Sequence, residues 1–384
     1  MLTATPKLDP VSRDTLLESA VASALGRGID GLDDVHREEL EYDAFLAHRE
    51  VHRLRGRALV DGRWESWSLI EKTTEGPLLA EPYLLDNGVR EFDAYASGLL
   101  DDLAPAVRAP RLHGSAAAGD GRLTLLLEEV VHDAGRPLDS ESLLRAAHDL
   151  GTLAGRWVGR VPEEPWLFTG WIDRHSQPQA MDAGRATLAT RHPAVVARLG
   201  DRLPAARGLI EAQPRVRGIL EGLPHTLCHH DAVGANVFVS SGATVLIDWE
   251  SVGPGPVGAD LASLLFSSVR RGDAMASVVA EVMEDAVEAY WHGVCDEDRS
   301  ITLGEVRLGL DASVALRWKL LADLAHAIEH DGSIRRGSLP EEPREQAMDD
   351  LLALADLLLR ASRRALENGS TPSTSGSFAA GSDM

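Results

Sequence analysis

Three polar residues follow one another at intervals that suit phosphate chemistry. Asp231 is followed by Asn236 five residues later and by Asp248 twelve residues after that. Two short apolar runs, 237–239 and 244–247, lie between the last two and flank a turn that contains glycine. This pattern predicts a β-hairpin with Asn236 at its start and Asp248 at its end. Because the ends of an antiparallel pair lie side by side, the two side chains could share one cation.

These residue types favour transfer of a phosphoryl group. A hard cation such as Mg²⁺ takes oxygen ligands, usually one or two from carboxylates and the rest from phosphate and water. Asp248 would supply charge and Asn236 a neutral carbonyl oxygen, while Asp231 could accept the proton of an attacking hydroxyl. Such chemistry depends mainly on positioning and on charge neutralisation. The stretch therefore indicates an enzyme that uses ATP and Mg²⁺.

The motif His-x-Asp-x4-Asn beginning at His229, an Ile-Asp pair ending at Asp248, and a later Asp-Leu-Ala beginning at Asp260 resemble the aminoglycoside phosphotransferase and choline kinase-like family. That family is related to the protein kinases. The resemblance implies an α+β, bilobal protein kinase-like fold with a small β-rich N-lobe and a larger, mainly helical C-lobe. It also implies that His229 and Asp260 brace the loop that carries Asp231. His230 occupies a position that is often glycine in this family.

The resemblance requires a phosphate-holding lysine and a glutamate partner upstream. Lys72 ends a β-rich run, and Glu91 lies in the first turn of a helix expected over 89–103, so we expect an ion pair between them. Glu71 and Asp93 are competing partners for Lys72. A carboxylate in a first turn is also favoured by the helix dipole alone.

The apolar run 122–131 resembles the hinge between the lobes, which pairs with adenine through its backbone. The carbonyl of Glu128 and the N–H of Val130 are the candidates, and a buried strand with no ligand role is the alternative. Protein kinases cover the phosphates with Gly-x-Gly-x-x-Gly, but the equivalent stretch, about 41–54, contains no glycine. The sequence leaves open which backbone groups replace that loop.

Four parts of the chain are expected: an N-terminal helix or extension (1–29), a nucleotide-binding N-lobe (30–127), a catalytic and acceptor-binding C-lobe (128–367) and a disordered tail (368–384) rich in Ser, Thr and Gly. In the C-lobe, 185–220 reads as one or two helices broken near Pro193 and Pro204. Three long helices are expected after the hairpin, over 274–294, 303–329 and 341–367.

Composition narrows the possible partners. The chain of 384 residues has 38 Lys and Arg against 60 Asp and Glu, a net charge of −22. Such a surface repels nucleic acid and anionic membranes and could attract a cationic acceptor. Its two cysteines, Cys228 and Cys295, form neither a disulfide framework nor a metal-thiolate spacing. With no signal peptide or apolar membrane span expected, the sequence predicts a cytoplasmic protein.

The acceptor is the least determined part of the prediction. A small hydroxylated metabolite or antibiotic, possibly cationic, is the first expectation, because the resemblance is closest to aminoglycoside kinases. A Ser or Thr of a precursor peptide is the alternative. Two other classes remain open: a pseudokinase, which binds without chemistry, and a metal hydrolase that would use His229, His230, Asp231 and Asp248. The sequence does not predict an oligomeric state.

Overall fold

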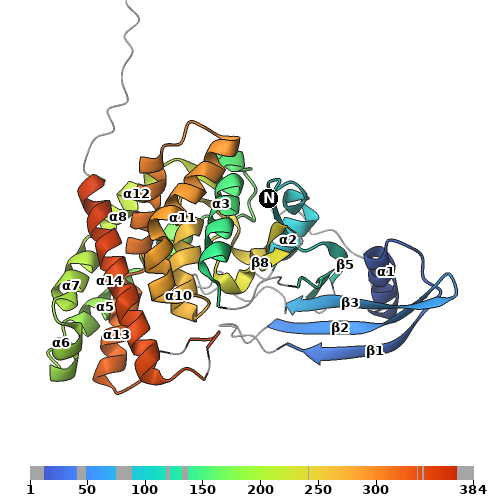
Figure 1. The fold of residues 1–384 in the computed structure, drawn as a ribbon, viewed down its shortest axis with the longest axis horizontal. Coiled ribbons are helices and arrows are strands. Elements are labelled where there is room, and N and C mark those ends of the chain that lie inside the picture. Colours follow the sequence, from blue (N-terminus) through green and yellow to red (C-terminus); the bar gives the residue numbers. More distant parts are fainter. Residues whose placement is uncertain are drawn as a thin grey trace, which may run out of the picture.

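The computed structural model describes residues 13–40, 49–74, 89–117, 122–131, 137–240, 242–334, 336–339 and 341–369. The chain forms two lobes, with an antiparallel sheet at one end and a larger group of helices at the other (Figure 1). This arrangement confirms the predicted bilobal kinase-like fold. Within the described residues, no helix is long and apolar enough to cross a membrane. The expected tail lies almost wholly outside the described residues.

The N-lobe sheet has five antiparallel strands in the order β1-β2-β3-β6-β5. Its strands are β1 (Gly31–Glu39), β2 (Arg49–Val60), β3 (Arg63–Thr74), β5 (Leu112–Ala117) and β6 (Leu123–Glu128). The turn between β2 and β3 consists of Asp61 and Gly62, which have φ angles of 48° and 74°. Two positive φ angles match the right-handed twist of a hairpin, which explains the Asp-Gly pair.

The two faces of the sheet pack against different helices. Strand residues alternate in direction, so Leu69 and Glu71 share one face of β3 while Ile70 and Lys72 share the other. Helix α1 (Arg13–Leu25) covers the Leu69 face with its buried Ala20 and Val21. Helix α2 (Arg90–Ala96) lies on the opposite face, where Phe92 packs with Leu125 and Leu127. Lys72 therefore points towards α2.

Helix α2 is shorter than predicted. It ends at Ala96 rather than near residue 103, and a 3₁₀ helix, η1 (Leu99–Asp101), follows. Gly98 separates them with φ of 76°. Glycine takes this left-handed conformation at little cost, which ends the helix where apolar spacing alone would have continued it.

Two small sheets lie between the lobes. In one, β8 (Val237–Ser240) and β9 (Ala243–Leu246) form the predicted hairpin, and β4 (Val107–Arg108) pairs in parallel with β9 (Figure 1). In the other, β7 (His225–Cys228) pairs with β10 (Gly253–Pro256). The stretch that carries Asp231, Asn236 and Asp248 therefore runs from β7 through a loop into the β8–β9 hairpin and just beyond it.

Helices α3 (Ser140–Trp157) and α11 (Ala276–Glu297) form the centre of the C-lobe. They cross so closely that a Cβ atom on Gly151 would lie 2.0 Å from the carbonyl oxygen of Tyr290, and one on Gly293 equally close to that of His148. Glycine is thus required at both positions.

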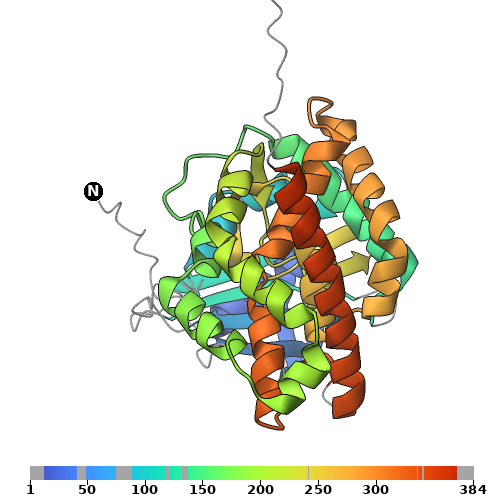
Figure 2. The same cartoon turned by 90° about the vertical axis from the view of Figure 1, so that its left-hand side faces the viewer.

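The remaining helices complete the C-lobe (Figure 2). They are α4 (Trp171–His175), α5 (Pro178–Leu188), α6 (Pro193–Leu199), α7 (Arg202–Glu211), α8 (Gln213–Glu221), α9 (Ala259–Ala262), α10 (Ser268–Arg271), α12 (Leu303–Ala315), α13 (Lys319–Glu329) and α14 (Arg344–Asn368). The stretch predicted as one or two helices over 185–220 is part of four. Pro193 begins α6 as expected, but Pro204 lies in the first turn of α7, where a missing N–H costs nothing.

The helix predicted over 303–329 is also interrupted. It divides into α12 and α13 at residues 316–318. Tertiary hydrogen bonds hold this break: Trp318 donates its indole N–H to the carbonyl of His175 at 3.0 Å, and Arg317 donates to Ser263 and Ser267. Periodicity could not reveal these distant partners.

Candidate active site

Lys72 connects the two lobes. Its Nζ lies 2.5 Å from Oε2 of Glu91 and also contacts Oδ1 of Asp248. Lys72 and Glu91 are 8% and 4% exposed, so little solvent screens the pair. The ion pair predicted between them is present in the structure.

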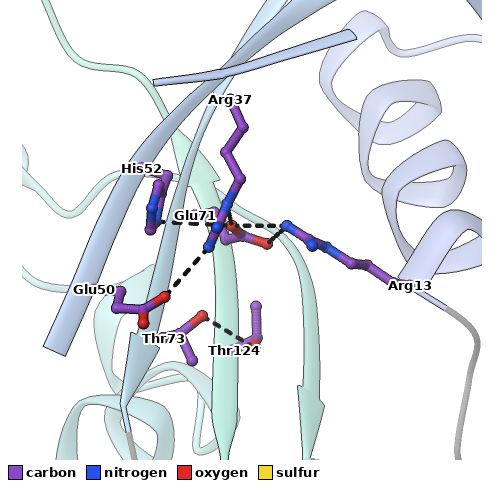
Figure 3. Close-up of polar contacts among 7 residues, drawn as sticks. All are labelled: Arg13, Arg37, Glu50, His52, Glu71, Thr73 and Thr124. Atoms are coloured by element: carbon purple, nitrogen blue, oxygen red, sulfur yellow. Dashed lines mark hydrogen bonds and ion pairs between the residues drawn. The ribbon is translucent and has the colours of Figure 1, made fainter. Parts of the chain in front are cut away.

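Glu71, the neighbouring candidate, takes no part in this pair. It lies on the opposite face of β3, where its carboxylate accepts hydrogen bonds from Arg13 at 2.9 Å and from Nε of Arg37 at 2.7 Å, with His52 nearby (Figure 3). Strand alternation directs adjacent side chains to opposite faces. Glu71 therefore ties α1 to β1 and β3, while Lys72 faces α2 and Asp248.

A second contact fastens α2 to the segment that follows Asp248. The backbone N–H of Trp249 donates to Oε1 of Glu91 at 3.4 Å, and the buried Arg90 donates to the carbonyl oxygens of Glu250 at 2.6 Å and Trp166 at 2.8 Å. No role for Arg90 was expected from the sequence, because an arginine at a helix start usually faces solvent. Its position beside Glu91 was the available signal.

Asp231 and Asn236 are joined directly in the loop after β7. Nδ2 of Asn236 donates to both the backbone carbonyl and Oδ2 of Asp231, each at 2.9 Å. Because Nδ2 makes both bonds, the Oδ1 atom of Asn236 is directed away from Asp231. Burial and, to a lesser extent, the nearby charge of Asp248 raise the pKa of Asp231, and Arg271 lowers it, so that the pKa lies at about 6.

The tautomer of His229 follows from its two partners. Nε2 lies 2.9 Å from the carbonyl oxygen of Ile247, so it must donate, and Nδ1 accepts from the backbone N–H of Asp231 at 3.3 Å. Burial lowers the pKa of His229 to about 4, which keeps the ring neutral. His229 therefore ties the Asp231 loop to the strand that leads to Asp248.

Asp260 holds the same loop from its other side. Its two carboxylate oxygens accept the backbone N–H groups of His229 and His230, both at 2.7 Å. His230 has a φ of 64°, a conformation that costs a non-glycine residue about 1–2 kcal/mol. Its ring donates to the carbonyl of Pro254 at 3.1 Å and stacks on Trp171. The positive φ gives a physical reason for the glycine preference at this position.

The sequence matches the Phosphotransferase enzyme family over residues 15–300. The chain belongs to this family. Among solved structures, it is similar to an aminoglycoside phosphotransferase from Alicyclobacillus acidocaldarius, with a TM-score of 0.50 and 14% identity over 94% of this chain and 96% of that chain. It is also similar to a choline/ethanolamine kinase family protein from Mesorhizobium loti, with a TM-score of 0.48 and 13% identity over 92% and 97% of the two chains. A search of curated proteins found no significant match.

The phosphotransferase has a further loop anchor that the sequence did not reveal. Asp273, 1% exposed, accepts the backbone N–H of Ala235 at 3.0 Å and a hydrogen bond from the Ser338 hydroxyl. A Cβ atom on Gly234 would lie 2.6 Å from Cβ of Asp273, so this contact requires glycine. A single aspartate after α10 carries no motif that would have indicated this role.

The hinge candidates of the phosphotransferase lie at the end of β6. The Glu128 carboxylate accepts Nη1 and Nη2 of Arg108 at 2.6 and 2.9 Å, which anchors this strand end to β4. Val130 follows two residues later. The adenine contacts of the Glu128 carbonyl and the Val130 N–H stay predictions. Most of the glycine-free stretch 41–54 lies outside the described residues, and its remainder belongs to β2.

The donor atoms around Asp248 suit a hard cation. Asp248 and Asn236 offer a carboxylate and an amide oxygen, the ligand types that Mg²⁺ prefers. A hydrolase-type centre would need His229, both of whose ring nitrogens already bind protein groups. In the described part of the chain, the group that could hold a metal through three His, Cys or carboxylate ligands is Cys228, His230 and Asp260. Both Asp260 oxygens there accept backbone N–H groups, so this group braces the loop.

Proposed function

We propose that this phosphotransferase moves the γ-phosphate of ATP to a hydroxyl group of a small molecule. The observation that carries the proposal is the convergence of distant segments at Asp248. Lys72 contacts Asp248, and the charge of Asp248 acts on Asp231, which is bonded to Asn236. A lysine, an amide and two carboxylates so arranged suit phosphoryl transfer.

Lys72 would hold the α- and β-phosphates, with Glu91 fixing its ammonium group. Asn236 and Asp248 would hold Mg²⁺, which neutralises phosphate charge when it is bound. The Glu128 carbonyl and the Val130 N–H would pair with adenine at the hinge. Each of these roles is a proposal supported by the positions of the residues.

Asp231 would orient the acceptor hydroxyl and accept its proton. The acceptor oxygen forms a bond to the γ-phosphorus, the bond from that phosphorus to the β–γ bridging oxygen breaks, and ADP leaves. A pKa near 6 makes Asp231 a stronger base than an ordinary aspartate while leaving it ionised at neutral pH. His229 and Asp260 are positioning residues, since both act on the Asp231 loop through its backbone.

The proposal is tested by following ATP consumption with Mg²⁺ over aminoglycosides, nucleoside antibiotics, sugars and Ser/Thr peptides. Phosphorylation of a small molecule supports it, whereas phosphorylation of peptides alone would favour the precursor-peptide alternative. Mg²⁺-dependent ATP hydrolysis that disappears in Asp248→Ala excludes a pseudokinase. Tight binding of zinc or manganese to the purified protein, together with no thermal shift on addition of ATP, would overturn the kinase function. The cytoplasmic location stays a prediction.

A further inference from the structure

A pocket of about 280 Å³ lies in the C-lobe beside the catalytic loop. Its wall comes from α4, α5, α10, α13 and α14, from residues 266–267 and from the break between α12 and α13. Arg317, in that break, connects the pocket to the loop: its Nη2 donates to Oγ of Ser263 at 2.9 Å, and this hydroxyl lies 3.4 Å from the carbonyl oxygen of His230. His230 directly precedes Asp231. The pocket therefore lies in the C-lobe, close to Asp231, the proposed base.

The wall carries an excess of positive charge. Its charged side chains are Arg174, Arg270, Arg317, Lys319 and Asp323. The ring of His175, also in the wall, stays neutral, because burial lowers its pKa well below the usual value. Four cations thus face one carboxylate in a protein whose net charge is −22. The pocket has the opposite sign to the molecule that contains it.

The cations of the wall differ in their contacts. Asp323 is shared by Lys319 at 2.6 Å and Arg270 at 4.0 Å. Among the described residues, Arg317 donates hydrogen bonds to neutral oxygens, namely two serine hydroxyls and, at 2.6 Å, the carbonyl of Ser313, while the charges of Asp231 and Asp260 act on it without direct contact. Arg174 forms no ion pair with any carboxylate in the described parts of the chain, and its charge lowers the pKa of Asp231. Within the part of the chain that the structure describes, two guanidinium groups near the reaction site therefore contact no carboxylate directly.

We propose that this pocket binds the acceptor and that the acceptor carries an anionic group, a carboxylate or a phosphate, beside the hydroxyl that is phosphorylated. The inference rests on the proposed kinase function and narrows its acceptor. Guanidinium groups bind carboxylates and phosphates through paired hydrogen bonds. A polyamine in the same place would meet like charges in a partly dry pocket, which is strongly unfavourable. The volume suits a molecule of about one sugar ring.

Probes that differ only in charge test this inference. Glucuronate and glucose 6-phosphate carry an anionic group on a hexose, glucose is neutral, and glucosamine is cationic; glycerate, glycerol 3-phosphate, glycerol and 3-amino-1,2-propanediol repeat the series on a smaller skeleton. Calorimetry with ADP and Mg²⁺ present measures binding, and ATP consumption measures turnover. We expect the anionic probes to bind at least tenfold more tightly than the neutral ones, with the amines weakest.

Variants of the wall residues test whether the preference for anionic probes comes from this pocket. The double variant Arg174→Gln/Lys319→Gln removes two wall charges without disturbing the three hydrogen bonds of Arg317. It should weaken the binding of anionic probes at least tenfold and leave the affinity for ADP unchanged. Arg307→Gln is the matched control: Arg307 lies on α12, pairs with Glu284 and is outside the pocket wall. It removes one positive charge, half the change of the double variant, and should leave probe affinity within twofold.

Measurements of ATP binding and of probe binding test the kinase function and the anionic acceptor separately. Failure to bind ATP would overturn the kinase function, whereas probe binding judges the pocket independently. Equal or undetectable binding across the charge series would overturn the anionic acceptor. So would tighter binding of glucosamine or kanamycin than of glucuronate, or phosphorylation of Ser/Thr peptides alone. If the double variant still bound anionic probes more tightly than neutral ones, the anionic group would bind outside this pocket.

Discussion

Lys72 and Asp248 lie 176 positions apart in the chain, yet Nζ of Lys72 contacts Oδ1 of Asp248. The same ammonium group pairs with Glu91 at 2.5 Å. One cation thus joins the sheet of the N-lobe, the helix packed against it and the hairpin of the C-lobe. This contact makes the geometry of the cleft sensitive to changes at any of the three residues.

Replacing Glu91 with glutamine should weaken ATP binding. Lys72 would lose one of its two carboxylate partners and be drawn towards Asp248. A charge-assisted hydrogen bond contributes about 1.5–3 kcal/mol, so we expect the KM for ATP to rise about tenfold or more. Steady-state kinetics at varied ATP and binding of a fluorescent nucleotide analogue would measure it.

Glu71→Gln is the matched control, because Glu71 adjoins Lys72 in β3 but faces α1. It should lower the free energy of unfolding by about 1 kcal/mol, since Arg13 and Arg37 can turn to solvent. The KM for ATP should not change. Equal effects of both variants on that KM would show that the Lys72–Glu91 pair has no special part in binding ATP.

Asp231→Asn should separate catalysis from nucleotide binding. Asparagine keeps the shape of the side chain but cannot accept the hydroxyl proton. We expect kcat to fall about 10²–10⁴-fold, the range of general base catalysis, with ATP affinity within about twofold. A rate within a few-fold of the parent protein would exclude Asp231 as the base.

Asp260→Asn should slow the reaction without touching substrate. Asparagine has one acceptor oxygen, so either the His229 or the His230 N–H would face an amide donor instead of an acceptor. The cost of such an unpaired group is about 1–3 kcal/mol, and we expect kcat to fall about tenfold to a hundredfold with the KM for ATP preserved.

Asp311→Asn provides the control for this variant. Asp311 is also buried, but it lies on α12 and pairs with Arg364 at 2.6 and 2.8 Å, outside the catalytic loop. It should lower thermal stability and leave kcat unchanged below the melting transition. A similar loss of kcat in both variants would mean that Asp260 supports the fold and not specifically the loop.

His230 should make stability depend on pH. Burial lowers its pKa from 6.5 to about 3, so below pH 6.5 the unfolded chain binds a proton that the folded chain does not. Its contribution to stability is therefore full above pH 6.5 and is lost as the pH falls towards 3. Relative to His230→Gln, the wild type should lose about 1–2 kcal/mol between pH 7 and pH 5, measured by urea unfolding. Parallel pH curves for the two proteins would contradict this.

The sequence by itself determined the local geometry of the site. The spacing of Asn236 and Asp248 around a short turn predicted the hairpin, because the turn and its two strands are neighbours in the chain. The sequence left Glu71 as a competing partner for Lys72, and the packed helices show that Lys72 faces α2 while Glu71 faces α1. Apolar spacing predicted the long helices but not all their ends. The end of α2 near Gly98 and the break between α12 and α13 at Arg317 do not follow from a periodic pattern.

Only the tertiary structure decided which carboxylate meets Lys72 and what charge the acceptor pocket has. Glu91 reaches Lys72 because α2 docks on Arg90 and on the segment after Asp248, both long-range contacts. The net charge of −22 was compatible with a cationic acceptor, but a sum over the chain does not say where the charges lie. The fold gathers Arg174 and Lys319 from distant helices into one wall, and charge acts over only about 8–10 Å in physiological salt. Local charge, which folding creates, therefore decides what the pocket can bind.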